Sequence, residues 1–413
     1  MQAITGEAPS RGARRRELME IAARMMNRDG AASVTPAAVA KVTGLTRNAL
    51  YYYYRDKESL LLSCYLAAAE HQFAVAEAAR SDSGAPEDRL ARLVNDLLAP
   101  DVALAILHDL DLLPESDAAV VRDLQSRTVA AVASIFEDGA SDQSFRPVPA
   151  ATAAHVLLGM ADWARLWQTW VTLGEEAGAA EPGPPGDVRE AILRSLLHGF
   201  TDTRLELQRP PEVSELLAER IDVLDREAVG EQKRLALLGI ASRLFNLRGI
   251  DATSIDDIAR AADATKGLIY SHFRNKAALV DACYDRAFDL YERFADAAES
   301  AGGIGALESL AWPMHLCAQA LLSRTPPLML QAGVTALPQR HRRRAMALAA
   351  RFRGDMTVAI ENGLASSASM DFIELSAGSF FWIPRWHEEA EQIGPYELGD
   401  RIVDLLVHGV LKR

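Results

Sequence analysis

The sequence has few cysteines and no long apolar run, and these shortages exclude several classes of protein. Its 413 residues contain three cysteines, at positions 64, 283 and 317. Three scattered thiols are too few for a disulfide framework or a cysteine metal cluster, and they indicate a reducing compartment. No apolar run approaches the roughly 18 residues of a membrane span, and the basic residues near the start are not followed by an apolar stretch. We therefore expect a cytoplasmic protein that does not enter a membrane.

Positive charge is also scarce, because 57 Asp and Glu outnumber 44 Lys and Arg and give a net charge of −13. Phosphate binding favours clustered Lys and Arg, so the overall balance argues against nucleic acid. The charge is unevenly distributed, however. Residues 1–65 carry ten basic against six acidic side chains, and residues 231–284 carry eight against six. Two mildly basic islands in an acidic chain are typical of DNA-binding modules on a larger scaffold.

Each basic island opens one copy of a repeat. The segment IAARMMNRDG from residue 21 matches IASRLFNLRG from residue 240, an offset of 219 that continues without a gap to residues 65 and 284. The same offset pairs two tryptophans of each copy: Trp163 with Trp382, and Trp167 with Trp386. So long a register indicates two units of about 200 residues joined head to tail.

Apolar residues recur at spacings of three and four throughout, so the predicted fold class is all-α. The segment 209–230 joins the two units and has no counterpart in the first. Pro210 and Pro211 are expected to end the preceding helix, and Ser214 to cap a semi-rigid linker helix with an apolar stripe from Leu217 to Ala228. A disordered tether is the alternative.

The start of each unit predicts short helices with defined caps. In the first unit, a helix from about Arg14 closes at Gly30, Thr35 and Thr46 cap the next two helices, and a fourth follows Asp56. The second unit repeats this plan with these residues: Gln232, Gly249, Ser254, Thr265 and Asn275. Two short helices joined by a tight turn form a helix-turn-helix, whose second helix enters the major groove of DNA. An ordinary helical hairpin is the alternative, and two ungapped basic copies argue against it.

The segments TGLTRNALYYYYRDKESLL and DATKGLIYSHFRNKAALV resemble the DNA-binding motif of the TetR family of bacterial transcriptional regulators. In that motif a Thr- or Ser-capped recognition helix ends in Tyr-x-His-Phe and is followed by Lys. The resemblance is strong in these segments and weak in the C-terminal parts of each half. It implies an N-terminal helix-turn-helix and a helical ligand-binding and dimerising domain in each half, so that one polypeptide holds both protomers of a dimer.

The resemblance divides the chain into five segments. These are a first helix-turn-helix domain at 1–65, a first helical regulatory and dimerisation domain at 66–208, the linker at 209–230, a second helix-turn-helix domain at 231–284 and a second helical domain at 285–413.

The resemblance also implies roles for individual residues. Expected near phosphates are Thr35, Thr46, Tyr51, Tyr53 and Lys57 in the first unit, and Ser254, Thr265, Tyr270, His272 and Lys276 in the second. Expected to read bases are Arg47, Asn48, Ala49 and Tyr52 in the first unit, and Lys266, Gly267, Leu268 and Ser271 in the second. Leu50 with Tyr54, and Ile269 with Phe273, should pack inward.

The two motifs depart from the family pattern and from each other. Tyr53 and Tyr54 stand where the family usually has His and Phe, and Asp263 stands where the turn usually has Gly. Tyrosine keeps a polar tip, and aspartate tolerates a left-handed backbone. Since all four expected base contacts differ between the copies, we expect a pseudo-palindromic or asymmetric operator.

The bodies behind the heads carry weaker signals. Trp163, Trp167, Trp382 and Trp386 are candidates for lining a pocket for an unidentified apolar effector, with packing between helices as the alternative. The resemblance also implies a four-helix bundle within the chain, from 149–173 with 187–208 and 370–387 with 395–411. A monomeric pseudo-dimer follows from this bundle, and a dimer of tandem chains is the alternative.

A basic run, QRHRRRAMALAARFR at 339–353, would contact flanking DNA or an anionic ligand, or form the solvated face of a helix. The expected function is a ligand-responsive transcriptional regulator that leaves its DNA operator when the effector binds. A ligand-sensing or protein-interaction scaffold with decayed heads is the alternative, and the retained Arg47, Lys57, Lys266 and Lys276 argue against it. No nucleophile–base pair, phosphate loop or metal-ligand set is visible, so we expect no enzyme, metal or cofactor.

Overall fold

The chain folds into helices. A computed structural model describes residues 11–99, 103–176, 187–201, 206–217, 225–330, 337–386, 390 and 392–412. Within these ranges the only strand-type pairing is an isolated bridge between Phe145 and Leu411, so the predicted all-α class is confirmed. No helix in the described ranges is long and apolar enough to cross a bilayer.

The first repeat contains eight α-helices and two 3-10 turns within the described residues. In order they are α1 (Arg11–Asp29), η1 (Ala31–Ser33), α2 (Pro36–Thr43), α3 (Arg47–Tyr51), α4 (Lys57–Ser81), α5 (Pro86–Leu97), η2 (Leu110–Leu112), α6 (Glu115–Ser141), α7 (Ala150–Glu176) and α8 (Val188–His198). We call α1–α3 the first head and α4–α8 the first body.

The second repeat follows the short helix α9 (Val213–Leu216). Its elements are α10 (Arg226–Arg248), α11 (Ile255–Ala261), α12 (Lys266–His272), α13 (Lys276–Ser300), α14 (Ala306–Leu321), α15 (Gln339–Glu361), η4 (Ser367–Ser369), α16 (Met370–Ser376), η5 (Ala377–Phe380) and α18 (Pro395–His408). We call α10–α12 the second head and α13–α18 the second body.

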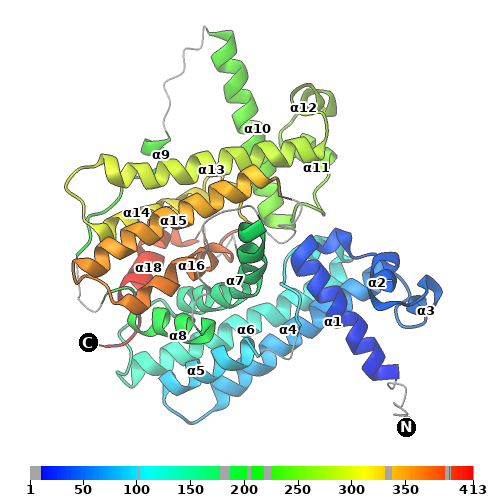
Figure 1. Cartoon of the computed structure of the whole chain (residues 1–413), viewed down its shortest axis with the longest axis horizontal. Coiled ribbons are helices and arrows are strands. Elements are labelled where there is room, and N and C mark those ends of the chain that lie inside the picture. Colours follow the sequence, from blue (N-terminus) through cyan, green and yellow to red (C-terminus); the bar gives the residue numbers. More distant parts are fainter. Residues whose placement is uncertain are drawn as a thin grey trace.

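The two heads lie on the same side of the molecule, at the right in Figure 1. Helices α4–α6 form one outer layer and α13–α15 the other, with α7, α8, α16 and α18 between them. One continuous apolar core contains residues of both bodies and of the second head, and a second core joins the first head to the first halves of α4 and α6. The chain is therefore arranged as two similar halves around a shared centre.

The halves meet at equivalent glycines. Gly159 on α7 and Gly378 in η5 occupy the same position of the repeat, and their backbones cross in contact. A Cβ on Gly159 would lie 2.3 Å from the Gly378 carbonyl oxygen, and one on Gly378 would lie 2.6 Å from the Gly159 carbonyl oxygen. Only glycine allows so close an approach of two backbones.

The ends of α8 and α18 also exchange backbone hydrogen bonds. The Phe200 N–H donates to the Leu406 carbonyl at 3.1 Å, and the Val410 N–H donates to the Leu196 carbonyl at 2.9 Å. Gly199 and Gly409 make these turns with φ angles of +70° and +62°, which glycine adopts without strain. His198 and His408, which precede these glycines and end α8 and α18, lie beside this exchange.

Two expected bundle helices differ from the structure. The segment expected as one helix over 370–387 is α16 followed by η5 and turns up to Trp386. Gly378 lies at this break, and Pro384 lacks the N–H that a helix needs. The helix expected to reach Gln208 ends at His198, because Gly199 turns the chain toward α18 well before the prolines.

The linker is not one helix in its described part. Glu212, and not Ser214, precedes α9, which ends at Leu216, and Asp225 caps a new helix from Arg226. The remainder of the expected apolar stripe, between residues 218 and 224, lies outside the described residues. Val213 is buried against α13 and α14, and its N–H donates to Gln319 Oε1 at 2.8 Å. The linker is therefore anchored on the second body, which local sequence does not reveal.

Candidate nucleic-acid interface

The caps predicted for the first head are confirmed. Thr35 Oγ1 accepts the Ala38 N–H at 3.1 Å at the start of α2, and Thr46 Oγ1 accepts the Ala49 N–H at 3.2 Å at the start of α3. Gly44 joins the two helices with φ +67°. These local interactions fix a helix-turn-helix whose second helix begins at Arg47.

The second head repeats this construction with different residues. Ser254 caps α11 in a reciprocal capping box with Asp257, and Thr265 Oγ1 accepts the Leu268 N–H at 3.2 Å. Asp263 takes the place of Gly44 in the turn, with φ +48°, as its tolerance of the left-handed region predicts. The start of α13 is capped by Asn275.

The recognition helices are anchored by the predicted inward pairs. Leu50 and Ile269 are fully buried, and Tyr54 and Phe273 are nearly so. The Tyr54 hydroxyl donates to the Arg15 carbonyl of α1 at 2.9 Å, and burial raises the pKa of this phenol. Tyr54 is thus a core residue with a polar tip, where the second head has a phenylalanine.

The remaining tyrosines of the run divide by exposure. Tyr51 ends α3 and Tyr52 lies in the turn beyond it, with exposed fractions of 38% and 62%. The Tyr51 hydroxyl accepts a hydrogen bond from Arg47 Nη2 at 3.1 Å. Tyr53 is half-buried against the core of the first head and contacts Tyr52 edge-on at 5.2 Å. Tyr53 is therefore less exposed to solvent than His272, its counterpart in the second head.

The face of the second recognition helix is more apolar. Leu268 and Tyr270 are 47% and 51% exposed, and Ser271 and His272 are exposed beside them. Lys266 Nζ lies 2.7 Å from Asp256 Oδ2 of α11. Of the eighteen residues expected to contact DNA, those that are half-buried are Ala49, Tyr53, Lys57 and Lys276, and the others are exposed.

The two lysines hold the same position in their heads. Lys57 Nζ donates to the Ala32 carbonyl at 3.0 Å, and Lys276 Nζ donates to the Asp251 carbonyl at 3.4 Å. Burial lowers the pKa of Lys276, against the opposing effect of nearby carboxylates. Each lysine therefore also ties α4 or α13 to the loop of its own head.

The heads touch each other directly, which the sequence did not predict. The Ala32 N–H donates to Asp251 Oδ2 at 3.0 Å, and these residues are equivalent in the repeat. Asp109 of the first body packs against Gly249, where a Cβ would lie 1.2 Å from its Oδ1, and Arg248 Nε lies 3.6 Å from Asp111 Oδ2. One hydrogen bond therefore joins the two heads directly, and the other contacts join the second head to the first body.

One asparagine in each head clamps the body behind it. Asn27 donates to the Leu104 carbonyl at 2.8 Å and accepts the Ile106 N–H at 2.9 Å. Asn246, its equivalent, donates to the Pro327 carbonyl at 2.8 Å and accepts the Met329 N–H at 3.0 Å. The sequence does mark this position, because both copies of the repeat have asparagine there. It does not reveal the partners of these asparagines, which lie far away along the chain.

The tryptophans suggested for ligand binding do not share one pocket. Trp163 lines an apolar cavity of about 170 Å³ in the second body. Trp382 and Trp386 border a cavity of about 40 Å³ beside His155, and Trp386 also borders one of about 500 Å³ between the repeats. The side chain of Trp167 lies outside the described residues.

The basic run on α15 is paired with an acidic face of α13. Its ion pairs join Arg340 to Asp281 and Asp285, Arg344 to Asp289 and Glu292, and Arg351 to Asp296 and Glu299, at 2.5–3.1 Å. These arginines are therefore engaged within the protein, and they do not form the free basic surface that DNA would need.

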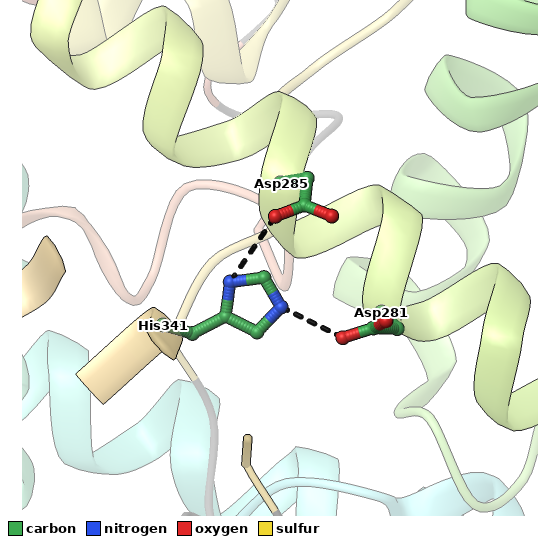
Figure 2. A group of neighbouring side chains, drawn as sticks. All are labelled: Asp281, Asp285 and His341. Atoms are coloured by element: carbon green, nitrogen blue, oxygen red, sulfur yellow. Dashed lines mark hydrogen bonds and ion pairs between the residues drawn. The ribbon is translucent and has the colours of Figure 1, made fainter. Parts of the chain in front are cut away.

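The buried His341 joins the same seam. Its Nε2 lies 2.8 Å from Asp281 Oδ1 and its Nδ1 lies 3.6 Å from Asp285 Oδ1. Figure 2 shows the imidazole between the two carboxylates, with one nitrogen facing each. The imidazole and the two carboxylates therefore form a polar link between α13 and α15.

The three cysteines are free thiols. Burial raises the pKa of each to about 12. Cys64 and Cys283 are equivalent, and both are buried, as expected for small apolar side chains.

Comparison with known proteins agrees with the repeat. The family described as "Bacterial regulatory proteins, tetR family" matches twice, at residues 18–64 and 237–283, which are equivalent segments of the two repeats. A second family, "Tetracyclin repressor-like, C-terminal domain", matches residues 83–170.

Individual relatives match over short segments. The HTH-type transcriptional regulator TtgR of Pseudomonas putida is 40% identical over 70 residues, which cover 17% of this chain and 33% of TtgR. The HTH-type transcriptional regulator AcrR of Shigella flexneri is 43% identical over 49 residues, or 12% of this chain and 23% of AcrR. The chain thus spans a third or less of these relatives.

A solved structure, the TetR family transcriptional regulator PfmR from Thermus thermophilus, is 21% identical. It covers 43% of this chain and 92% of its own, with a TM-score of 0.34. The two matched DNA-binding domains and the matched C-terminal domain show that this chain belongs to the TetR family, as a tandem member with two family units in one polypeptide.

Proposed function

We propose that the chain is a cytoplasmic, ligand-responsive transcriptional repressor whose two unlike heads bind one DNA operator. The observation that carries this proposal is the pair of capped recognition helices, α3 and α12, which lie on the same side of the molecule and have different exposed residues. Membership of a family of DNA-binding regulators supports it over an enzyme or a scaffold.

Each recognition helix has the parts that a major-groove reader needs. The N-caps Thr46 and Thr265 leave a helix N-terminus open to a phosphate, and Tyr51 and Tyr270 are exposed at equivalent positions further along each helix. Lys57 and Lys276 place positive charge at the start of the following helices. We assign phosphate contacts to these residues and to the neighbouring Thr35, Ser254, Tyr53 and His272.

Base reading falls to the exposed positions between them. Arg47 and Asn48 suit guanine and adenine, whose edges offer paired acceptors or an acceptor and a donor. At the same positions the second head has Lys266 and Gly267, followed by the exposed apolar Leu268. Such a face favours different bases, so the operator is predicted to have two unlike half-sites.

One chain supplies both heads. The glycine crossing and the exchanged backbone bonds between α8 and α18 support a monomeric pseudo-dimer as the DNA-binding form. A covalent pseudo-dimer is free of the symmetry that a homodimer imposes on its operator. An effector would release DNA by binding more tightly to a state in which the heads no longer fit it.

The test is selection of bound sequences from random DNA by the purified chain at 0.15 M salt, followed by affinity measurements on the selected site. We expect one chain per site. The double variant Lys57→Ala/Lys276→Ala should lose roughly a hundredfold in affinity and show a shallower salt dependence. Lys412→Ala, at an exposed position near the C-terminus and far from both heads, is the matched control.

Because both lysines also bond to backbone carbonyls, the melting temperature of the double variant has to be measured beside its affinity. Failure of the folded wild-type chain to enrich any sequence, or unchanged affinity of a folded double variant, would contradict the proposal.

A further inference from the structure

We propose that the effector is a neutral, apolar molecule and that only the second repeat binds it, in the cavity of about 170 Å³ between α13, α15 and the first repeat's Trp163. This proposed difference in ligand binding between the repeats rests on the proposed function. It concerns the two cavities that the repeat makes equivalent.

The equivalence follows from the register of the repeat. Tyr291, Phe381 and Trp163 line the cavity in the second body. Their counterparts, Gln72, Asp162 and Trp382, line the cavity of about 40 Å³ in the first body. Each cavity thus has one wall from its own long helix, one from the central segment of its own repeat, and a tryptophan from the other repeat.

The cavity in the second body is built for an apolar guest. Phe288 and Phe294 on α13, and Leu348 and Phe352 on α15, line it, and none of its lining side chains carries a charge. The Tyr291 hydroxyl already donates to the Leu328 carbonyl at 3.3 Å, and burial keeps the Cys317 thiol neutral by raising its pKa to about 12. A charged ligand would lose its hydration here without gaining a partner.

The equivalent space in the first body is filled by a polar network. Gln72 Nε2 donates to Asp162 Oδ1 at 3.1 Å, and Arg165 Nη1 donates to the same oxygen at 3.0 Å. Arg165 Nη2 also donates to the Leu97 carbonyl at 2.6 Å. His155 stacks on Trp382 with ring centres 4.4 Å apart. A guest would have to displace these satisfied buried groups, so this cavity serves stability and not sensing.

The cavity in the second body is connected to both repeats. Trp163 belongs to α7 of the first repeat and meets Phe381 edge-on at 5.1 Å. Met329 also lines the cavity, and its N–H is held by Asn246 in the first helix of the second head. A guest that shifts Met329 therefore acts on the second head through one hydrogen-bonded residue, and on the other repeat through Trp163.

The experiment uses 2-naphthol, a neutral bicyclic probe, titrated calorimetrically into the full chain without DNA. We expect saturable binding of one molecule per chain. Ala349→Phe, which fills the cavity from α15, should weaken binding at least tenfold, as should Ala345→Phe. Ala347→Phe adds the same ring at an exposed position of the same helix and should leave binding unchanged. The sulfonate analogue, 2-naphthalenesulfonate, should bind at least tenfold more weakly.

Two equal sites per chain, no saturable binding below 1 mM, or unchanged binding by both folded cavity-filling variants would overturn the inference. Since these titrations contain no DNA, they can succeed while DNA selection fails, and the reverse. If a cavity-filling variant still binds the selected DNA, its loss of 2-naphthol binding concerns ligand sensing alone.

Discussion

The first and second repeats share a scaffold and differ where each would meet a base or a ligand. Matching residues include Gly159 with Gly378, which cross at the interface, and Asn27 with Asn246, which clamp the heads. Differing residues include those on the exposed faces of α3 and α12 and those around the two equivalent cavities. Backbone geometry thus constrains both repeats alike, while the surfaces that we propose to meet other molecules differ between them.

The glycine crossing should respond symmetrically to mutation, and with the largest effect. We expect Gly159→Ala and Gly378→Ala each to reduce the free energy of unfolding by about 3 kcal/mol, because each methyl would overlap a backbone carbonyl that cannot move aside easily. Gly354→Ala, with open space around it on α15, should be neutral or slightly stabilising. Urea unfolding measures the stability of all three variants. If only one of the two crossing variants lost stability, the two repeats would not be equivalent at this crossing.

Mutation of either asparagine clamp should lower stability equally, but only one mutation should change the response to a ligand. Asn27→Ala and Asn246→Ala each leave a backbone N–H and a carbonyl without their partners, at a cost of about 2 kcal/mol. Only Asn246→Ala removes the link to cavity-lining Met329. We therefore expect it alone to reduce the change in DNA affinity that 2-naphthol causes. Equal loss of this response in both variants would argue against sensing by the second repeat.

The smallest difference lies in the helix caps. Ser254 hydrogen-bonds Asp257 through its hydroxyl and its N–H, and these bonds lower the pKa of Asp257 to about 2, whereas the equivalent of Asp257 in the first head is Ala38. Because the folded pKa is depressed, this stabilisation is present above the ordinary aspartate pKa and is lost as the pH falls from about 4 toward 2.

Hydrogen exchange tests this difference locally. Protection at the start of α11 should fall over that pH window, and Asp257→Asn should remove the pH dependence while costing about 0.5–1 kcal/mol. Protection at the start of α2 should not follow the same curve. If protection at the starts of both helices fell over the same pH window, the capping box would not be the cause of the fall.

Much of each head was predictable because its interactions are local. Caps such as Thr46 and Ser254 bond to amides three residues away, and the left-handed Asp263 follows from side-chain chemistry at one position. The inward pairing of Leu50 with Tyr54 followed from helical spacing in the same way.

The breaks in the bodies were not predictable, since they depend on residues far away in sequence. Residues 370–387 have apolar spacing suited to one helix, yet the chain breaks where Gly378 crosses Gly159. The offset of 219 makes Asp162 and Phe381 equivalent, but only the folded structure shows that both line cavities. The head-to-head bond from Ala32 to Asp251 was equally invisible.

We propose above all that the two heads read different sequences within one operator. This proposal is tested most directly by giving the second head the reading residues of the first, in the variant Lys266→Arg/Gly267→Asn/Leu268→Ala/Ser271→Tyr. A Cβ on Gly267 would make an ordinary contact with Thr265 Oγ1 at 3.7 Å, so the exchange should not disturb α12. Selection from random DNA should yield two unlike half-sites for the wild-type chain and an inverted repeat for the variant. A perfect inverted repeat already selected by the wild-type chain would contradict the account.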